Sequence, residues 1–143
     1  MKRQTARIQR TKFNTAARKK DKPHAFGLPF DSALECDRYI FLKSLEQEDV
    51  IADLRYKPTY TLMSKFRDGF GHRYRAVKME LDQSYLHKGK LVIEEVKAED
   101  KRKKGQKRYP TATALFWVKW KLLARMFPNV RRRIVTSPTE PVG

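Results

Sequence analysis

The sequence predicts an α/β domain, and three changes in the spacing of its apolar residues carry that prediction. Apolar residues recur at helical spacing between residues 31 and 48, alternate with polar residues at a period of two between 53 and 97, and return to helical spacing between 111 and 127. Helices that flank a run of strands are typical of a sheet covered by helices. We therefore expect a central mixed sheet with flanking helices in the order α, β, β, β, α, β.

The first helix is predicted to begin after Asp31 or Ser32, because either side chain can cap the first turn, and to end near Glu48. Its apolar side consists of Leu34, Ile40, Phe41, Leu42 and Leu45. The first strand starts at Asp53, and Pro58 interrupts it, which is typical of a strand edge or a strand end. One face of this strand carries Leu54, Tyr56, Tyr60 and Leu62.

The second and third strands are predicted to form a hairpin. The second strand spans residues 74–84, after a turn at Asp68, Gly69 and Gly71, and it alternates apolar with charged side chains. Lys88 and Gly89 close a tight turn, and the third strand spans residues 91–97. Each of these strands therefore has one apolar face.

The last two elements are a helix and a short strand. The helix is predicted over residues 111–127, where aromatic residues and leucines are frequent, and Pro128 with Asn129 ends it. Residues 131–135 are rich enough in β-formers to add a final strand to the sheet.

The chain has the length of one domain. Its 143 residues include 40% hydrophobic residues, which is enough to bury a core. We expect a basic, flexible N-terminal arm at residues 1–24, a globular domain at residues 25–135 and a flexible C-terminal tail at residues 136–143. The single Cys36 excludes an internal disulfide and a thiolate-rich zinc site. Since no stretch approaches the roughly 18 apolar residues that span a bilayer, we expect no membrane partner.

The charge of the chain predicts a polyanionic partner. Lys and Arg number 33 against 16 Asp and Glu, which gives a formal net charge of +17, and nucleic acid is the leading candidate. Two basic segments are candidate DNA contacts, the N-terminal one with Arg18, Lys19 and Lys20, and a loop with Lys101, Arg102, Lys103, Lys104, Lys107 and Arg108. Lys119 and Lys121 flank Trp120 and are candidate contacts to DNA or to a second subunit, although core packing also explains the tryptophan.

The predicted hairpin brings two acids and a lysine together. If Lys88 and Gly89 are the central residues of the turn, residues whose numbers sum to 177 lie opposite each other, so Asp82 faces Glu95. Lys97 projects from the same side as Glu95, because alternate residues share a face. Two carboxylates can hold Mg²⁺ or Mn²⁺ for phosphodiester hydrolysis, with a nearby ammonium group to steady charge.

Two alternatives stay open at this point. An ordinary exposed sheet face with cross-strand ion pairs also explains these charges, and a longer turn would shift the register and move Asp82 away from Glu95. Glu80 shares a face with Asp82, so it could pair with Lys97 or replace Asp82 as a ligand. Glu94 points to the opposite face and is expected to be a solvent-exposed or ion-paired residue.

The ordered set of these elements and residues resembles the PD-(D/E)XK nuclease superfamily. The segments 30–39, 55–58, 93–97 and 116–122, with the Phe127-Pro128-Asn129 ending, resemble a family of small nuclease-like phage proteins, and the layout is similar to the phage endonuclease I group of Holliday-junction resolvases. The resemblance covers roughly residues 25–135. It implies a restriction-endonuclease-like αβββαβ core.

The resemblance also implies roles for single residues. Asp82 and Glu95 would be the central metal ligands, Glu35 would reach the metal directly or through water, and Lys97 would be the catalytic lysine. Lys119 and Lys121 would lie on the second helix, near the site.

We therefore expect a Mg²⁺- or Mn²⁺-dependent DNA endonuclease that acts on branched DNA during phage recombination or packaging. Symmetric cutting of a junction predicts a homodimer. The expected location is the cytoplasm, of a bacterial host cell if the gene belongs to a phage. The rival prediction is a non-catalytic basic protein that binds nucleic acid, in which the acids only form ion pairs.

Overall fold

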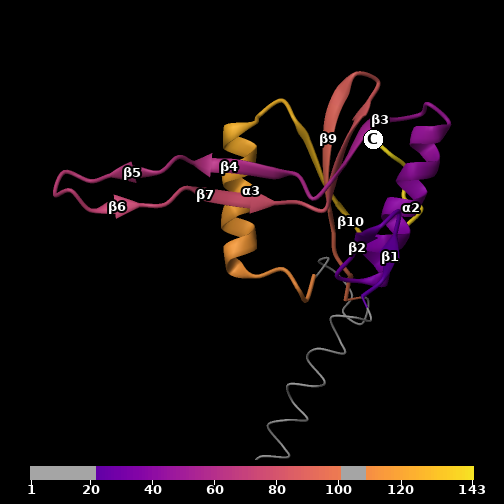
Figure 1. Ribbon diagram of the computed structural model, residues 1–143, viewed down its shortest axis with the longest axis horizontal. Helices are drawn as coiled ribbons and strands as arrows, with labels where there is room; N and C mark the ends of the chain where they lie inside the picture. The colour runs from indigo at the N-terminus through magenta and orange to yellow at the C-terminus, as the bar shows by residue number, and fades with distance from the viewer. Residues whose placement is uncertain (1–21, 101–108) are drawn as a thin grey trace, which may run out of the picture.

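The computed structural model describes residues 22–100 and 109–143, and it confirms a mixed α/β fold. In this part of the chain, two helices accompany a four-stranded sheet with the strand order β10-β9-β8-β3 (Figure 1). The helices are α2 (Ala33–Gln47) and α3 (Ala114–Met126). The sheet consists of β3 (Ala52–Tyr56), β8 (Gln83–His87), β9 (Lys90–Val96) and β10 (Arg131–Val135).

The sheet is mixed, as expected. Strands β8 and β9 form an antiparallel hairpin, β3 pairs antiparallel with β8, and β10 runs parallel to β9. The ladder from Gln83 opposite Glu94 to His87 opposite Lys90 confirms the predicted register. Lys88 and Gly89 have φ values of 51° and 76°, the left-handed backbone that a tight two-residue hairpin turn requires.

The helices cover opposite faces of the sheet because neighbouring residues of β9 point to opposite sides. Val92 packs with Leu42 of α2, whereas Ile93 packs with Leu123 of α3. Helix α2 begins at the predicted place, since the Ser32 side chain accepts a hydrogen bond from the backbone N–H of Glu35. Helix α3 begins later than predicted, because Thr113 caps it.

The first and second predicted strands are each broken in two. The first divides into β3 and β4 (Thr59–Met63) around Lys57 and Pro58, and the second divides into β7 (Val77–Glu80) and β8 around Leu81 and Asp82. The two breaks lie together, because Lys57 donates its backbone N–H to Asp82 and Leu81 donates to Pro58. The outer halves leave the sheet as a separate hairpin.

This hairpin, residues 59–80, is called the hairpin arm below. Strands β4 and β7 pair antiparallel near its base, and β5 (Phe66–Arg67) pairs with β6 (Arg73–Tyr74) near its tip. Its base packs on α3, and its outer part projects away from the body of the protein (Figure 1). Both strands of the arm were expected in the central sheet, which is wrong because their hydrogen bonds join them to each other.

The two ends of the described chain contact the domain. His24 belongs to β1 (His24–Ala25), which pairs with β2 (Leu28–Pro29), although it falls within the predicted N-terminal arm. Residues 136–143 also lie against the body, with Val142 packed against the buried cluster of Leu42, Ile51, Tyr85 and Val92. The expected flexibility of both ends stays a prediction. Among the described residues, neither helix is long and apolar enough to cross a membrane.

Candidate functional site

The structure brings together the four residues that the sequence analysis singled out. Glu35 lies in the first turn of α2, Asp82 lies in the break between β7 and β8, and Glu95 lies near the end of β9, one residue before the strand stops. Lys97 follows β9 directly. Three separate elements therefore meet where β9 ends.

The position of Asp82 is fixed by the backbone of β9. Its N–H donates to the carbonyl of Glu94 at 3.2 Å, and its Oδ2 accepts a hydrogen bond from the N–H of Val96 at 2.6 Å. The carboxyl groups of Asp82 and Glu95 lie within hydrogen-bonding reach of each other. These two hydrogen bonds hold the Asp82 carboxylate at the end of β9, on the side that Glu95 occupies.

Lys97 is tied to the acids and to α3. Its Nζ lies 3.0 Å from Glu95 Oε1, with side-chain exposures of 14% and 11% for the lysine and the glutamate, so water screens this pair only partly. The same ammonium group lies 4.8 Å from the centre of the Phe116 ring, a cation–π contact. The lysine is therefore held beside the acid pair.

Burial and mutual repulsion make the three acids harder to ionise, and the lysine offsets this only in part. Burial, followed by repulsion from Glu95 and Glu35, raises the pKa of Asp82 to about 8. Burial also raises the pKa of Glu95, although Lys97 opposes the shift. Burial and the nearby Asp31 raise the pKa of Glu35. Two adjacent carboxyls of this kind share a proton unless a cation replaces it.

Glu35 offers an oxygen that the protein does not use. Its Oε2 is buried and accepts no hydrogen bond from the described residues. A buried acceptor without a partner costs free energy, so such an atom in a cluster of acids suits a ligand or a water held there. This observation favours Glu35 as a third acid of the site.

These residues fit a hard divalent cation. Within residues 22–100 and 109–143, no three His, Cys, Asp or Glu side chains are gathered closely enough to be a ready metal cage. Mg²⁺ is commonly held by one or two carboxylates together with waters and substrate phosphate. Asp82 and Glu95 could supply those carboxylates, and the Glu35 Oε2, which has no hydrogen-bond partner among the described residues, could hold a water beside them.

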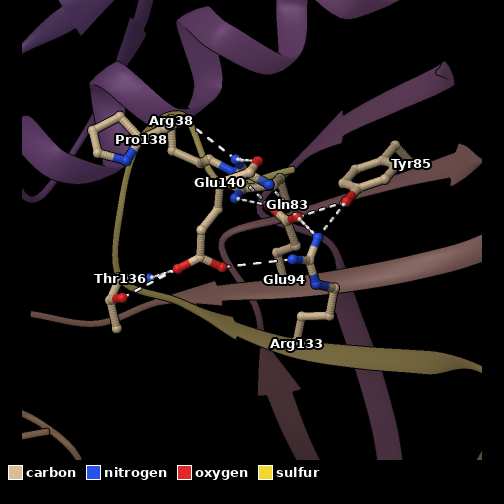
Figure 2. Close-up of polar contacts among 8 residues, drawn as sticks. All are labelled: Arg38, Gln83, Tyr85, Glu94, Arg133, Thr136, Pro138 and Glu140. Atoms are coloured by element: carbon tan, nitrogen blue, oxygen red, sulfur yellow. Dashed lines mark hydrogen bonds and ion pairs between the residues drawn. The ribbon is translucent and has the colours of Figure 1, made fainter. Parts of the chain in front are cut away.

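A buried polar network lies on the other face of β9, and the sequence analysis missed it. Glu94, expected to be exposed or ion-paired, is fully buried and pairs with Arg38 of α2, whose side chain is equally buried, at 2.7 Å (Figure 2). Glu94 also accepts hydrogen bonds from Gln83 at 2.9 Å and from Tyr85 at 2.6 Å. Burial opposes ionisation, but the contacts with Arg38 hold the pKa of Glu94 below its usual range.

The same network holds the C-terminal segment. Arg38 donates to the backbone carbonyls of Pro138 and Glu140, and Arg133 of β10 lies 3.5 Å from the Glu140 carboxylate (Figure 2). The only sequence signal for this network was the charge of Glu94 on a face that is otherwise apolar. The pair fixes the N-terminal half of α2, and with it Glu35, against β9.

The remaining candidates are placed less close to the acids. Glu80 is exposed and lies opposite Thr59 in the hairpin arm, and Lys97 pairs with Glu95, so the alternative in which Glu80 pairs with Lys97 is wrong. Lys119 donates to the carbonyl of Lys78 at 2.9 Å and ties α3 to the arm, while Lys121 is exposed. The remaining predicted DNA contacts lie outside the described residues: Arg18, Lys19, Lys20, Lys101, Arg102, Lys103, Lys104, Lys107 and Arg108.

A family model with the description "Protein of unknown function (DUF1064)" matches residues 10–138. No curated protein and no solved structure matches the chain.

Proposed function

We propose that this chain, which belongs to the DUF1064 family, is a Mg²⁺- or Mn²⁺-dependent DNA endonuclease with a restriction-endonuclease-like core. The observation that carries the proposal is the contact between Asp82 and Glu95 beside Lys97, with the unsatisfied oxygen of Glu35 nearby. An ordinary exposed sheet face would not bury these acids or raise their pKa values. The resemblance to PD-(D/E)XK nucleases supports the same roles for the same residues.

Each residue of the site has a task in this proposal. Asp82 and Glu95 would hold the cation, which when bound would supply charge to polarise the phosphate and to make a bound water more acidic. Lys97, positioned by Glu95 and by the Phe116 ring, steadies the negative charge that develops on the phosphate. Glu35 orients a water from the first turn of α2. The oxygen of the water would form a bond to phosphorus while the P–O bond to one sugar oxygen breaks; that oxygen takes up a proton and leaves as a hydroxyl, and the phosphate stays on the other product as a monoester.

The proposed substrate is branched DNA, as in phage recombination or packaging. A net charge of +17 favours contacts with DNA phosphates, which do not depend on the base sequence. The shape of the DNA would therefore dominate the choice of substrate. Paired cuts on a junction call for two sites. One face of α3 leaves Leu115, Val118 and Leu122 exposed at a spacing of three and four residues, which supports a homodimer built on this helix.

The direct test uses labelled four-way junction, flap, duplex and single-stranded DNA with Mg²⁺ or Mn²⁺. We expect metal-dependent cuts that disappear with EDTA, with Asp82→Asn and with Lys97→Ala, while Glu80→Gln, an exposed acid two residues from Asp82, keeps activity. Asp82→Asn should still bind DNA, because it removes a ligand of the metal and no DNA contact.

The second candidate is a basic nucleic-acid-binding protein without catalysis, which the net charge favours equally. It predicts tight binding and no cleavage in either metal. In that case Asp82→Asn has no cleavage to remove, and the acids serve only the fold.

A further inference from the structure

The hairpin arm carries cations that the protein itself leaves unpaired. Its outer half contains Lys65, Arg67, Arg73 and Arg75 against the single acid Asp68. None of these cations forms an ion pair with a described residue. Arg67 and Arg73 are direct partners across the β5–β6 ladder, so two like charges share one face. Such a pair is unfavourable in the free protein and becomes favourable when an anion lies against it.

The arm also presents exposed aromatic rings. Phe66 and Tyr74, partners on the next rung, stack at 4.8 Å between ring centres and are 45% and 46% exposed. Together with Lys65, Arg67 and Arg73 they line a concavity of about 370 Å³. Phe70, at the tip, is 91% exposed. Aromatic rings among arginines are the side chains on which unpaired bases stack.

The tip is ordered by its one acid. Oδ1 of Asp68 accepts hydrogen bonds from the backbone N–H groups of Phe70 and His72, both at 2.9 Å, and Oδ2 lies 3.0 Å from the His72 ring. Gly71 supplies the left-handed backbone at φ 85° that the turn needs. The turn therefore fixes Phe70 in an exposed position, where a soluble domain gains nothing from a large apolar ring.

The arm begins at the candidate site. Strand β7 ends at Glu80, and Asp82 follows two residues later. The backbone carbonyl of Asp82 accepts a hydrogen bond from the backbone N–H of Lys57 at the base of the arm. About ten residues of chain separate this base from the tip, seven of them in β4 and β5, which is roughly 30 Å at the rise of an extended chain and comparable to one turn of duplex DNA. Two-stranded β ribbons also fit the major groove of DNA. A duplex lying along the arm would thus lead to the acids.

We propose that the hairpin arm binds branched DNA, with Arg67 and Arg73 against the sugar-phosphate backbone and Phe70 stacked on a base exposed at the branch. The inference rests on the proposed function in taking branched DNA as the ligand. It gives the enzyme a structural means of choosing branch points, which the cluster of acids by itself does not supply. Lys119, which bonds to the carbonyl of Lys78, fastens the arm's base to α3.

The test measures DNA binding by fluorescence anisotropy in EDTA, so that no cleavage is needed. We compare Arg67→Gln/Arg73→Gln and Phe70→Ala with Lys88→Gln/Lys90→Gln, a control that removes two exposed cations at the opposite end of β9. The double arginine variant should weaken binding to every DNA about tenfold and lower the slope of log K against log salt by about two. Phe70→Ala should weaken binding to a four-way junction about tenfold and leave duplex binding unchanged.

Equal affinities for the arginine variant and the lysine control would overturn the proposal. It would also fail if Phe70→Ala left junction binding intact but changed the mass in light scattering, since the arm would then join two copies of the chain. Arm-dependent binding without cleavage in Mg²⁺ or Mn²⁺ would support the arm and refute the nuclease. Metal-dependent cleavage, together with arm variants that bind DNA as well as the lysine control does, would support the nuclease and refute the role of the arm. Thermal unfolding of each variant shows that it is folded.

Discussion

The buried pair of Arg38 and Glu94 yields the sharpest prediction about stability. Both side chains are fully buried, and the guanidinium group donates to both carboxylate oxygens, at 2.9 and 2.7 Å. Glu94→Gln keeps the shape of the side chain but removes its charge, and so leaves Arg38 charged and out of water. Breaking a buried pair in this way costs about 3–5 kcal/mol, which corresponds to a fall in Tm of about 10–15 °C for a chain of this size.

Glu95→Gln is the matched control, since it makes the same chemical change one residue along β9. Glu95 faces the acid cluster, where burial raises its pKa, so loss of its charge should leave Tm unchanged or higher. Thermal and urea unfolding followed by circular dichroism measure both variants. A loss below about 1 kcal/mol for Glu94→Gln, or an equal loss for Glu95→Gln, would refute this account of what holds α2 against the sheet.

Three further predictions concern the acids and the C-terminal segment. The pKa of Asp82 is raised to about 8, so its contribution to stability is full below its unfolded value of 3.8 and is lost as the pH rises toward 8. In EDTA, the stability of Asp82→Asn relative to the wild type should therefore rise between pH 4 and pH 8. If the free energies of unfolding of the two proteins changed in parallel with pH, this account would be wrong. At pH 8, Mg²⁺ or Mn²⁺ should raise the Tm of the wild type but not of Asp82→Asn in differential scanning fluorimetry; equal shifts would place the metal elsewhere. Removal of residues 137–143 should lower Tm by several degrees, because Arg38 loses two carbonyl acceptors and Val142 leaves the core, and an unchanged Tm would support a loose tail.

Local patterns were sufficient for the elements whose partners are close in sequence. Ser32 and the helical spacing after it predict α2, and the Lys88-Gly89 turn predicts both the β8–β9 hairpin and its register. That register places Asp82 beside Glu95 and puts Lys97 on the same side. Glu35 was assigned to the site from the resemblance, and the structure places it close enough to raise the pKa of Asp82.

Tertiary structure decided the features that depend on distant partners. The alternation of residues 74–84 is the same for one strand as for two, and only the hydrogen bonds between Lys57 and Asp82 and between Leu81 and Pro58 divide it into arm and sheet. From the sequence, Glu94 is expected to be exposed or ion-paired. Only the packing of α2 against β9 buries it, together with Arg38. Periodicity reports which face a side chain occupies, whereas its burial and its partner depend on what packs against that face. The sequence by itself thus determined the two helices, the β8–β9 hairpin and the grouping of Asp82, Glu95 and Lys97, and the packing of the chain determined the arm and the buried ion pair.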